Sequence, residues 1–274
     1  MPDDDVPPPF AEVRNDQVSA VSAVANSPGP LTIALRTEQS VVVLTVAGVL
    51  AGANTEALRD GIVKATLAKP AAVIVDINGL RVPTESDWLV LLGARWQDGA
   101  RPDVPILLVC ASRTRRDAIA RTGVVRFMPA YTNEKGAKKA LARLTLRDVR
   151  HAQARLPASL TSLRESRRLV REWLTAWSYP GFIPVALVVV NVFLENVLKH
   201  TGSDPVVRVE CDGATATVAV SDGAGAPAAR LPSPPKGTDV SGLAIVSALS
   251  RDWGSTPTSS GKTVWAVIGP ENQL

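Results

Sequence analysis

The chain has 274 residues, 46% of them hydrophobic, which is enough for two ordinary domains with a core each. Its net charge is only +4 and its densest basic runs, 113–116 and 164–171, are short, so we interpret them as solvated helix faces and expect no nucleic-acid partner. Cys110 and Cys211 have no Cys or His at metal-ligand spacing, which argues against a zinc site or a disulfide framework and favours a reducing cytoplasm.

Residues 1–30 begin with an acidic, proline-rich run and predict a disordered tail, because a secretory signal would need basic residues and an apolar core. The longest apolar stretch, Phe182 to Leu194, contains Pro184 and Asn191. It is shorter than the roughly 20 residues that cross a bilayer. We therefore expect a soluble protein without a membrane partner.

From Leu31 onward, short β-rich runs alternate with longer helical ones, which indicates an α/β domain over 31–147. Strands are expected at 41–48, 71–77 and 105–110, and helices at 54–68, 85–97, 113–122 and 133–144.

After a predicted linker at 148–156, regular βαβ alternation stops, and we expect an α+β two-layer sandwich over 157–270. Its helices are expected within 155–177 and at 184–199 and 242–253, its strands at 206–211, 215–222 and 262–268, with a Pro/Gly-rich loop at 223–240.

The second domain carries polar residues in an ordered set. Asn196 and His200 are four residues apart and share a helix face, with Lys199 close to it. Asp222 ends a strand and is followed by glycines, which allow a backbone to approach a ligand closely. Gly242 opens a helix, whose free N–H groups can hold an anion. A structural interpretation explains single members of this set, but not their order.

This order, closed by "GKTVW", resembles the Bergerat-type ATP-binding fold of histidine kinases, gyrase and Hsp90, and especially the anti-sigma-factor serine kinases. The resemblance covers roughly 155–268 and implies ATP and Mg²⁺ as ligands. Asn196 would bind magnesium and Asp222 would accept a hydrogen bond from the adenine amino group. The other residues that it implies around the nucleotide are Lys199, His200, Gly223, Gly225, Gly242 and Thr263.

Two departures weaken the implied kinase activity. In this kinase branch the general base is a glutamate four residues before the magnesium asparagine, and that position is Val192 here. Glu195, the nearest carboxylate, is a weak candidate because it lies about 100° round the helix, where we interpret it as solvated or ion-paired. The glycine loop is one residue short if Asp222 is the adenine-binding acid, whereas aligning the glycines puts Ser221 in that place. We expect weak or absent phosphoryl transfer.

The first domain resembles a STAS domain over about 31–145, through "VLTVAGVLAGANTEALRDGI", "DINGL" and "RTGV". In phosphorylatable members an Asp-Ser pair opens a helix at the position that Thr84 and Glu85 occupy here. "TESD" also predicts a capping box between Thr84 and Asp87. Glu85 cannot be phosphorylated as a serine is, but places a fixed negative charge at a helix N-terminus. Thr84 and Ser86 are neighbouring candidate acceptors.

Both resemblances favour a cytoplasmic bacterial partner-switching regulator that acts by protein binding. The expected partners are a STAS-domain protein, an anti-sigma kinase or a sigma factor, with a contact between the two domains or a homodimer also open. One alternative is an active serine/threonine kinase that phosphorylates a STAS partner in trans. Another is an interaction scaffold that binds no nucleotide.

Overall fold

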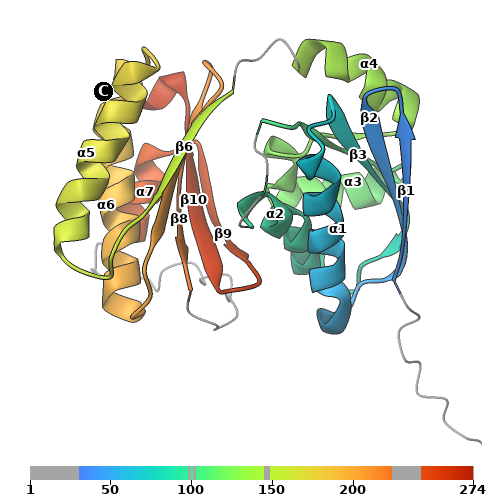
Figure 1. Ribbon diagram of the computed structural model, residues 1–274, viewed down its shortest axis with the longest axis horizontal. Coiled ribbons are helices and arrows are strands. Elements are labelled where there is room, and N and C mark those ends of the chain that lie inside the picture. Colours follow the sequence, from blue (N-terminus) through green and yellow to red (C-terminus); the bar gives the residue numbers. More distant parts are fainter. Residues whose placement is uncertain (1–30, 98–99, 101–102, 145–148, 224–241, 274) are drawn as a thin grey trace, which may run out of the picture.

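The computed structural model shows two domains, each built on its own five-stranded sheet (Figure 1). The residues that the structure describes are 31–97, 100, 103–144, 149–223 and 242–273. The predicted disordered tail and most of the predicted Pro/Gly-rich loop lie outside them.

The first domain is an α/β domain, as its alternating sequence pattern predicts. Its sheet has the order β1-β2-β3-β4-β5, with β1 antiparallel to β2 and the other neighbours parallel. The strands are β1 (Thr32–Glu38), β2 (Val41–Val49), β3 (Ala72–Arg81), β4 (Ile106–Val109) and β5 (Ala130–Tyr131). The helices are α1 (Thr55–Leu67), α2 (Leu89–Trp96), α3 (Arg113–Arg121) and α4 (Glu134–Leu144), with 3-10 turns η1 (Gly52–Asn54), η2 (Glu85–Trp88) and η3 (Val124–Arg126).

Helices cover both faces of this sheet, which explains the unbroken apolar runs of its central strands. One face packs against α1, α2 and α3 through buried side chains that include Leu58, Leu91 and Ile119. The other face packs against α4, where Ala137 and Ile74 belong to a smaller core. The sheet therefore fixes α2 and α3 on one side of the domain, away from α4.

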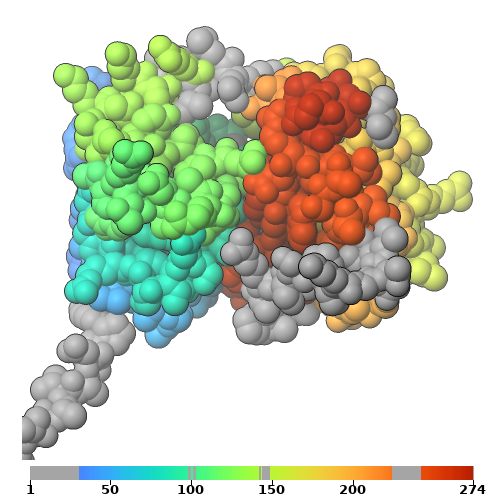
Figure 2. All heavy atoms as spheres, turned by 180° about the vertical axis from the view of Figure 1, so that it is seen from behind, coloured from blue at the N-terminus to red at the C-terminus, as the bar shows by residue number. Residues whose placement is uncertain are grey.

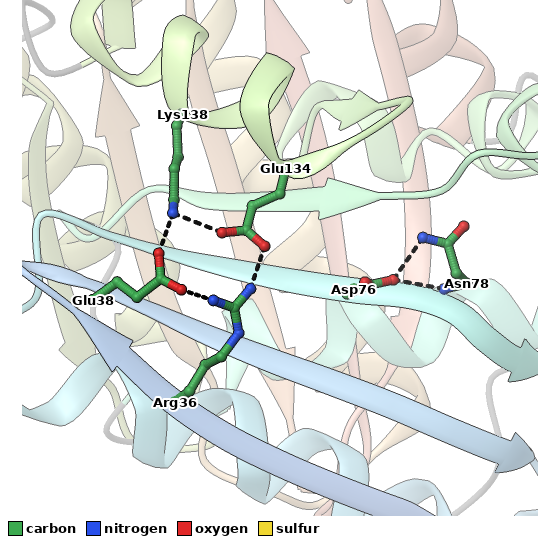
Figure 3. Close-up of polar contacts among 6 residues, drawn as sticks. All are labelled: Arg36, Glu38, Asp76, Asn78, Glu134 and Lys138. Carbon is green, nitrogen blue, oxygen red and sulfur yellow. Dashed lines mark hydrogen bonds and ion pairs between the residues drawn. The ribbon is translucent and has the colours of Figure 1, made fainter.

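Charged residues cover the β1 edge of the sheet (Figure 3). Arg36 forms ion pairs with Glu38 and Glu134, and Lys138 of α4 forms ion pairs with the same two carboxylates. The hydrogen bond from Lys138 lowers the pKa of Glu134 below its usual value. Charges at a sheet edge discourage pairing with a further strand.

The second domain is a two-layer α+β unit. Its sheet has the order β6-β7-β8-β10-β9, and every neighbouring pair is antiparallel. The strands are β6 (Arg150–Arg155), β7 (Val206–Cys211), β8 (Ala216–Asp222), β9 (Asp252–Pro257) and β10 (Lys262–Ile268). The helices are α5 (Thr161–Ala176), α6 (Ile183–His200) and α7 (Gly242–Leu249), with 3-10 turns η4 (Pro180–Phe182) and η5 (Pro270–Asn272). The helices lie on one face of the sheet (Figure 1).

The apolar helix α6 lies at the centre of this helical layer. The segment Pro180–His200 is long and apolar enough to cross a membrane by length and composition, but half of its apolar window is buried inside the protein. Val185, Val189 and Phe193 are fully or almost fully buried in the core beneath the sheet. The burial of α6 is that of a core helix between α5 and α7.

The predicted linker 148–156 instead contains strand β6, which pairs with β7 along its whole length. The sequence "RHAQAR" does not look like a strand because β6 is a sheet edge, and its side chains are exposed or only half-buried. The second domain therefore begins at Arg150, within the segment that was predicted to join the domains.

The predicted helix 242–253 is also shorter than expected. The helix α7 ends at Leu249, and the chain turns directly into β9. This strand contains Gly254, where an added Cβ would lie 2.7 Å from the ring of Trp265 on the paired strand β10. A glycine at this position interrupts any apolar alternation, so the sequence pattern does not reveal β9.

Candidate functional site

The C-terminal half of α6 carries the predicted magnesium ligand. Val192 is buried and packs against the start of α7, because a Cβ added to Gly242 would lie 2.7 Å from Val192 Cγ1. Asn196, one turn later, is half-buried on the same face. Lys199 and His200 are exposed in the last turn. Asn196 therefore lies on the side of α6 where α7 begins.

Glu195 lies on a different face of α6, as its 100° offset predicts. Its Oε1 accepts a hydrogen bond of 2.5 Å from Asn191 Nδ2, and Asn191 Oδ1 accepts one of 2.7 Å from Arg167 Nη1 on α5. These two exposed hydrogen bonds join α6 to α5, whereas Val192 contacts α7. Glu195 is therefore not directed to the position that a general base would need.

The register between β8 and β10 separates two groups of residues predicted for the nucleotide pocket. Asp222 lies opposite Lys262, and its buried carboxylate is 3.7 Å from Lys262 Nζ on the face that packs against the helices. Ser221 lies opposite Thr263, and their hydroxyl oxygens are 2.7 Å apart on the other face. Asp222 therefore faces the helical layer, and Ser221 faces away from it.

The same alternation corrects the prediction for Thr263. This residue was expected at the far wall of a pocket that also contains Asp222, but successive side chains of β10 point to opposite faces of the sheet. Thr263 is fully buried on the face that turns toward the first domain. The sequence could not show this, because the register between the two strands decides which residues face one another.

Of the predicted glycines, Gly223 and Gly242 are described, while Gly225 lies outside the described residues. The Gly223 backbone N–H donates to Ser203 Oγ at 2.9 Å, which ties the end of β8 to the loop after α6. Gly242 opens α7 against Val192. The end of β8 therefore lies beside the loop after α6, and the start of α7 lies beside the middle of α6.

The side chains at this place fit ATP and magnesium only in part. Asn196 offers an amide oxygen, a ligand type that magnesium accepts beside phosphate oxygens. Asp222 offers a carboxylate, but Lys262 is already paired with it. Within the described ranges, no three His, Cys, Asp or Glu side chains gather as a metal site. Magnesium held here would depend on Asn196 and on the phosphates.

The predicted switch position of the first domain is held by an exposed ion pair. Arg121 of α3 donates from Nε and Nη2 to the two carboxylate oxygens of Glu85, both at 2.8 Å. This hydrogen bonding raises the pKa of Arg121. The Thr84 and Ser86 hydroxyls are 3.0 Å apart, and Asp87 Oδ2 accepts from the Thr84 backbone N–H at 3.1 Å, as in the predicted capping box. Glu85 therefore presents a negative charge in a fixed geometry.

Two arginines at the start of α3 hold the backbone near this position, which the sequence analysis missed. Arg115 donates to three carbonyl oxygens within residues 77–80, at 2.9 to 3.3 Å, and Arg116 donates to two carbonyls after β4. In the same strand, Asp76 Oδ1 accepts from the backbone and side chain of Asn78 (Figure 3). This basic run is therefore part of a clamp, and the interpretation as a solvated face was wrong for these two residues.

The helix α2 packs on the face of the second sheet that its own helices leave uncovered (Figure 1). In the space-filling view the two domains touch each other (Figure 2). Arg95 of α2 forms a mostly buried ion pair with Glu210 of β7. Arg208 of the same strand donates to the Arg95 carbonyl oxygen at 3.0 Å and lies 5.7 Å from the ring centroid of Trp96. A cation at the last turn of a helix is favoured by the helix dipole. Charge and aromatic contacts together hold the two domains against each other.

Trp265 of β10 is the largest fully buried side chain in the protein and lies at this contact. Its ring meets Phe127 edge-on at 5.1 Å, and its Nε1 donates to Thr256 Oγ1 at 3.0 Å. Gly123 and Gly254 leave room for the ring, because an added Cβ would lie 3.3 or 2.7 Å from it. On the face of the second sheet that turns toward the first domain, we call one group of side chains the docking face: Arg208, Glu210, Thr217, Ala219, Trp265 and Val267.

Comparison with known proteins assigns part of the chain. Residues 32–137 match the family model of the STAS domain. A solved anti-sigma factor antagonist from Mycobacterium paratuberculosis is similar, with 19% identity and a TM-score of 0.36 over 41% of this chain and 95% of that one. The anti-sigma factor antagonist SpoIIAA in its unphosphorylated form is similar at 20% identity and a TM-score of 0.30, over 40% and 97% of the two chains. No curated protein matches the chain.

Proposed function

We propose, from the STAS domain that residues 32–137 form, that this protein is a bacterial partner-switching regulator that acts in the cytoplasm by binding other proteins. Its partners would be a kinase-type anti-sigma factor, a sigma factor or another STAS-domain protein. The second domain would be a degenerate relative of the anti-sigma kinases that contributes binding rather than efficient phosphoryl transfer.

The observation that carries this proposal is the ion pair between Glu85, at the proposed switch position, and Arg121. Glu85 supplies a permanent carboxylate where phosphorylatable relatives carry a serine, and Arg121 holds it through two hydrogen bonds. A carboxylate has less charge than a phosphate but the same sign. The first domain would therefore keep one binding state, independent of phosphorylation.

Two further observations support a second domain without efficient kinase activity. Val192, which would occupy the general-base position, has no ionisable group and packs against Gly242 at the start of α7. Glu195 accepts a hydrogen bond from Asn191, which in turn accepts one from Arg167 of α5. ATP and Mg²⁺ remain proposed ligands at Asn196 and Asp222, where they would act on the conformation of the domain.

Affinity capture with residue 85 variants tests the proposed function. Wild type, Glu85→Ser and Glu85→Lys would be used as baits in extracts of the source bacterium, with Glu56→Lys, an exposed acid on α1, as a matched control. Each captured sigma factor or anti-sigma factor would then be purified and titrated by calorimetry. We expect at least about tenfold weaker binding for Glu85→Lys, a difference of about 1.4 kcal/mol. Equal binding by Glu85→Lys and Glu56→Lys would refute the proposal.

Nucleotide titration separates this proposal from its alternatives. Calorimetry with ATP and ADP, with and without magnesium, should show saturable binding that Asp222→Ala removes and that loses its magnesium dependence in Asn196→Ala. Absence of heat at millimolar nucleotide would instead support a scaffold without nucleotide. Rapid transfer of the γ-phosphate to a STAS partner by the wild type would support the active-kinase alternative.

A further inference from the structure

The contact between the domains concentrates the polar atoms that lack a partner. Within the part of the chain that the structure describes, five buried side-chain atoms have no hydrogen bond in the protein. They are Arg59 Nε, Arg95 Nε, Trp96 Nε1, Gln97 Oε1 and Glu210 Oε1. All belong to α1, to α2 and its end, or to the strand β7 opposite. Buried polar groups are normally satisfied, so a contact that leaves polar atoms without a partner in the protein is stabilised less than a fully paired one.

Charge adds a second reason to expect that this contact opens. Arg95, Glu210 and Arg208 are all largely removed from solvent. Withdrawing charges from water is costly, and the attraction within such a pair often only offsets that cost. When the domains separate, these groups regain water and each sheet keeps its own helices, but Ala219, Trp265 and Val267 leave the core that they share with the first domain.

The opened surfaces would not be stable if left bare. Separation exposes Trp265 on the docking face, and Trp96 and Phe127 on the first domain, all of which take part in the contact. Aromatic residues beside arginine are the usual centre of a protein–protein interface. A partner must therefore offer an apolar surface with the opposite arrangement of charges.

We propose that the docking face is a binding surface for a STAS domain in trans, and that the first domain of a second copy of this chain occupies it when the intramolecular contact opens. This occupant is favoured because the contact within one chain already shows that the two surfaces fit. A helix of the STAS domain that ends in Arg95 and Trp96 lies there against Glu210 and Arg208. Two open copies present the same pairs of surfaces to each other and form a reciprocal dimer with two equal contacts.

This exchange deepens the proposed partner-switching function and rests on it for its regulatory meaning. The contact between the first domain and the docking face can be tested without any partner protein. In a reciprocal dimer, both the docking face and the α2 side of the first domain would be covered. A foreign STAS domain on the docking face would instead leave the α2 side of the first domain exposed. Closed, reciprocal and partner-bound states would then compete for the same two surfaces.

Charge reversal at one ion pair tests the proposal in the full chain. Arg95→Glu places two carboxylates together and Glu210→Arg places two guanidinium groups together, so each variant alone should open and remain a monomer. An equal mixture restores opposite charges only between copies. Light scattering should show at least half of the mixed protein at twice the chain mass of 28.9 kDa at about 50 μM. The double variant, with the pair reversed within one chain, should return to a monomer with the thermal stability of the wild type.

A second charge-reversed pair and a co-expression experiment serve as controls for this test. A reversed pair away from the contact, Arg113→Glu with Asp117→Arg on α3, should produce no dimer when the two single variants are mixed. If a single variant does not fold, the two are co-expressed with different tags, and each tag should then purify both chains. A mixture that stays monomeric, or co-expressed chains that do not purify together, while the double variant folds normally, would overturn the proposal.

Discussion

Replacing Trp265 by alanine should both destabilise the protein and uncouple its two domains. The side chain is 2% exposed. Full burial of an aromatic side chain removes about 150–250 Å² from water, which at about 25 cal/mol per Å² gives an upper limit of about 4–6 kcal/mol. The hydrogen bond to Thr256 adds only about 1 kcal/mol. Burial therefore dominates, and we expect Trp265→Ala to lower the free energy of unfolding by about 3–5 kcal/mol.

Guanidinium unfolding followed by circular dichroism, together with scanning calorimetry, measures both effects. The wild type should unfold in one transition, because Trp265 joins the cores of the two domains, and Trp265→Ala should unfold in two. Trp253→Ala is the matched control, since Trp253 lies on the adjacent strand but faces the helices and is half-buried. A loss below about 1 kcal/mol for Trp265→Ala, or the same splitting in Trp253→Ala, would refute the reasoning.

Three smaller predictions concern single contacts. Gly242→Ala should destabilise by about 1–3 kcal/mol in chemical denaturation, because its Cβ would meet Val192, and this extra loss should vanish when Val192→Ala is already present. Arg115→Ala should leave carbonyls in the last part of β3 without their donor, at a cost of about 1–3 kcal/mol, and speed amide hydrogen exchange there; unchanged exchange would contradict the clamp. The hydrogen bond from Arg251 lowers the pKa of Glu271 from 4.5 to about 2, so the pair stabilises the fold above pH 4.5 and this contribution is lost as the pH falls toward 2; an NMR titration should show a higher pKa of Glu271 in Arg251→Ala than in the wild type.

The strands that escaped prediction are the four sheet edges. The predicted strands correspond to β2, β3, β4, β7, β8 and β10, which lie inside their sheets and carry buried apolar runs. The strands β1, β5, β6 and β9 have a neighbour on one side only. Their side chains are charged, exposed or half-buried, or the strand is only two residues long. Sequence patterns record burial, so strands with little burial leave little trace in them.

The candidate site also has features that could be predicted from the sequence and features that could not. The helix offset that sets Glu195 apart from Asn196 follows from 100° per residue and could be predicted from spacing alone. The guanidinium partners could not. Arg121 at Glu85 and Arg115 at residues 77–80 are separated from their partners by 35 or more positions in the sequence. Only the packing of α3 beside the end of β3 brings these groups together.

By itself, the sequence determined which chemical groups this protein has, such as the carboxylate of Glu85 and the aliphatic side chain of Val192, and that its two halves are α/β and α+β. Those follow from residue identity and from periodicity, which are local. The tertiary structure decided which faces those groups occupy. Strand register turned Asp222 toward the helices and Thr263 away from them, and domain packing placed Trp265 and Glu210 against α2. Such contacts join distant segments, and their energies depend on burial and geometry that no short stretch of sequence contains.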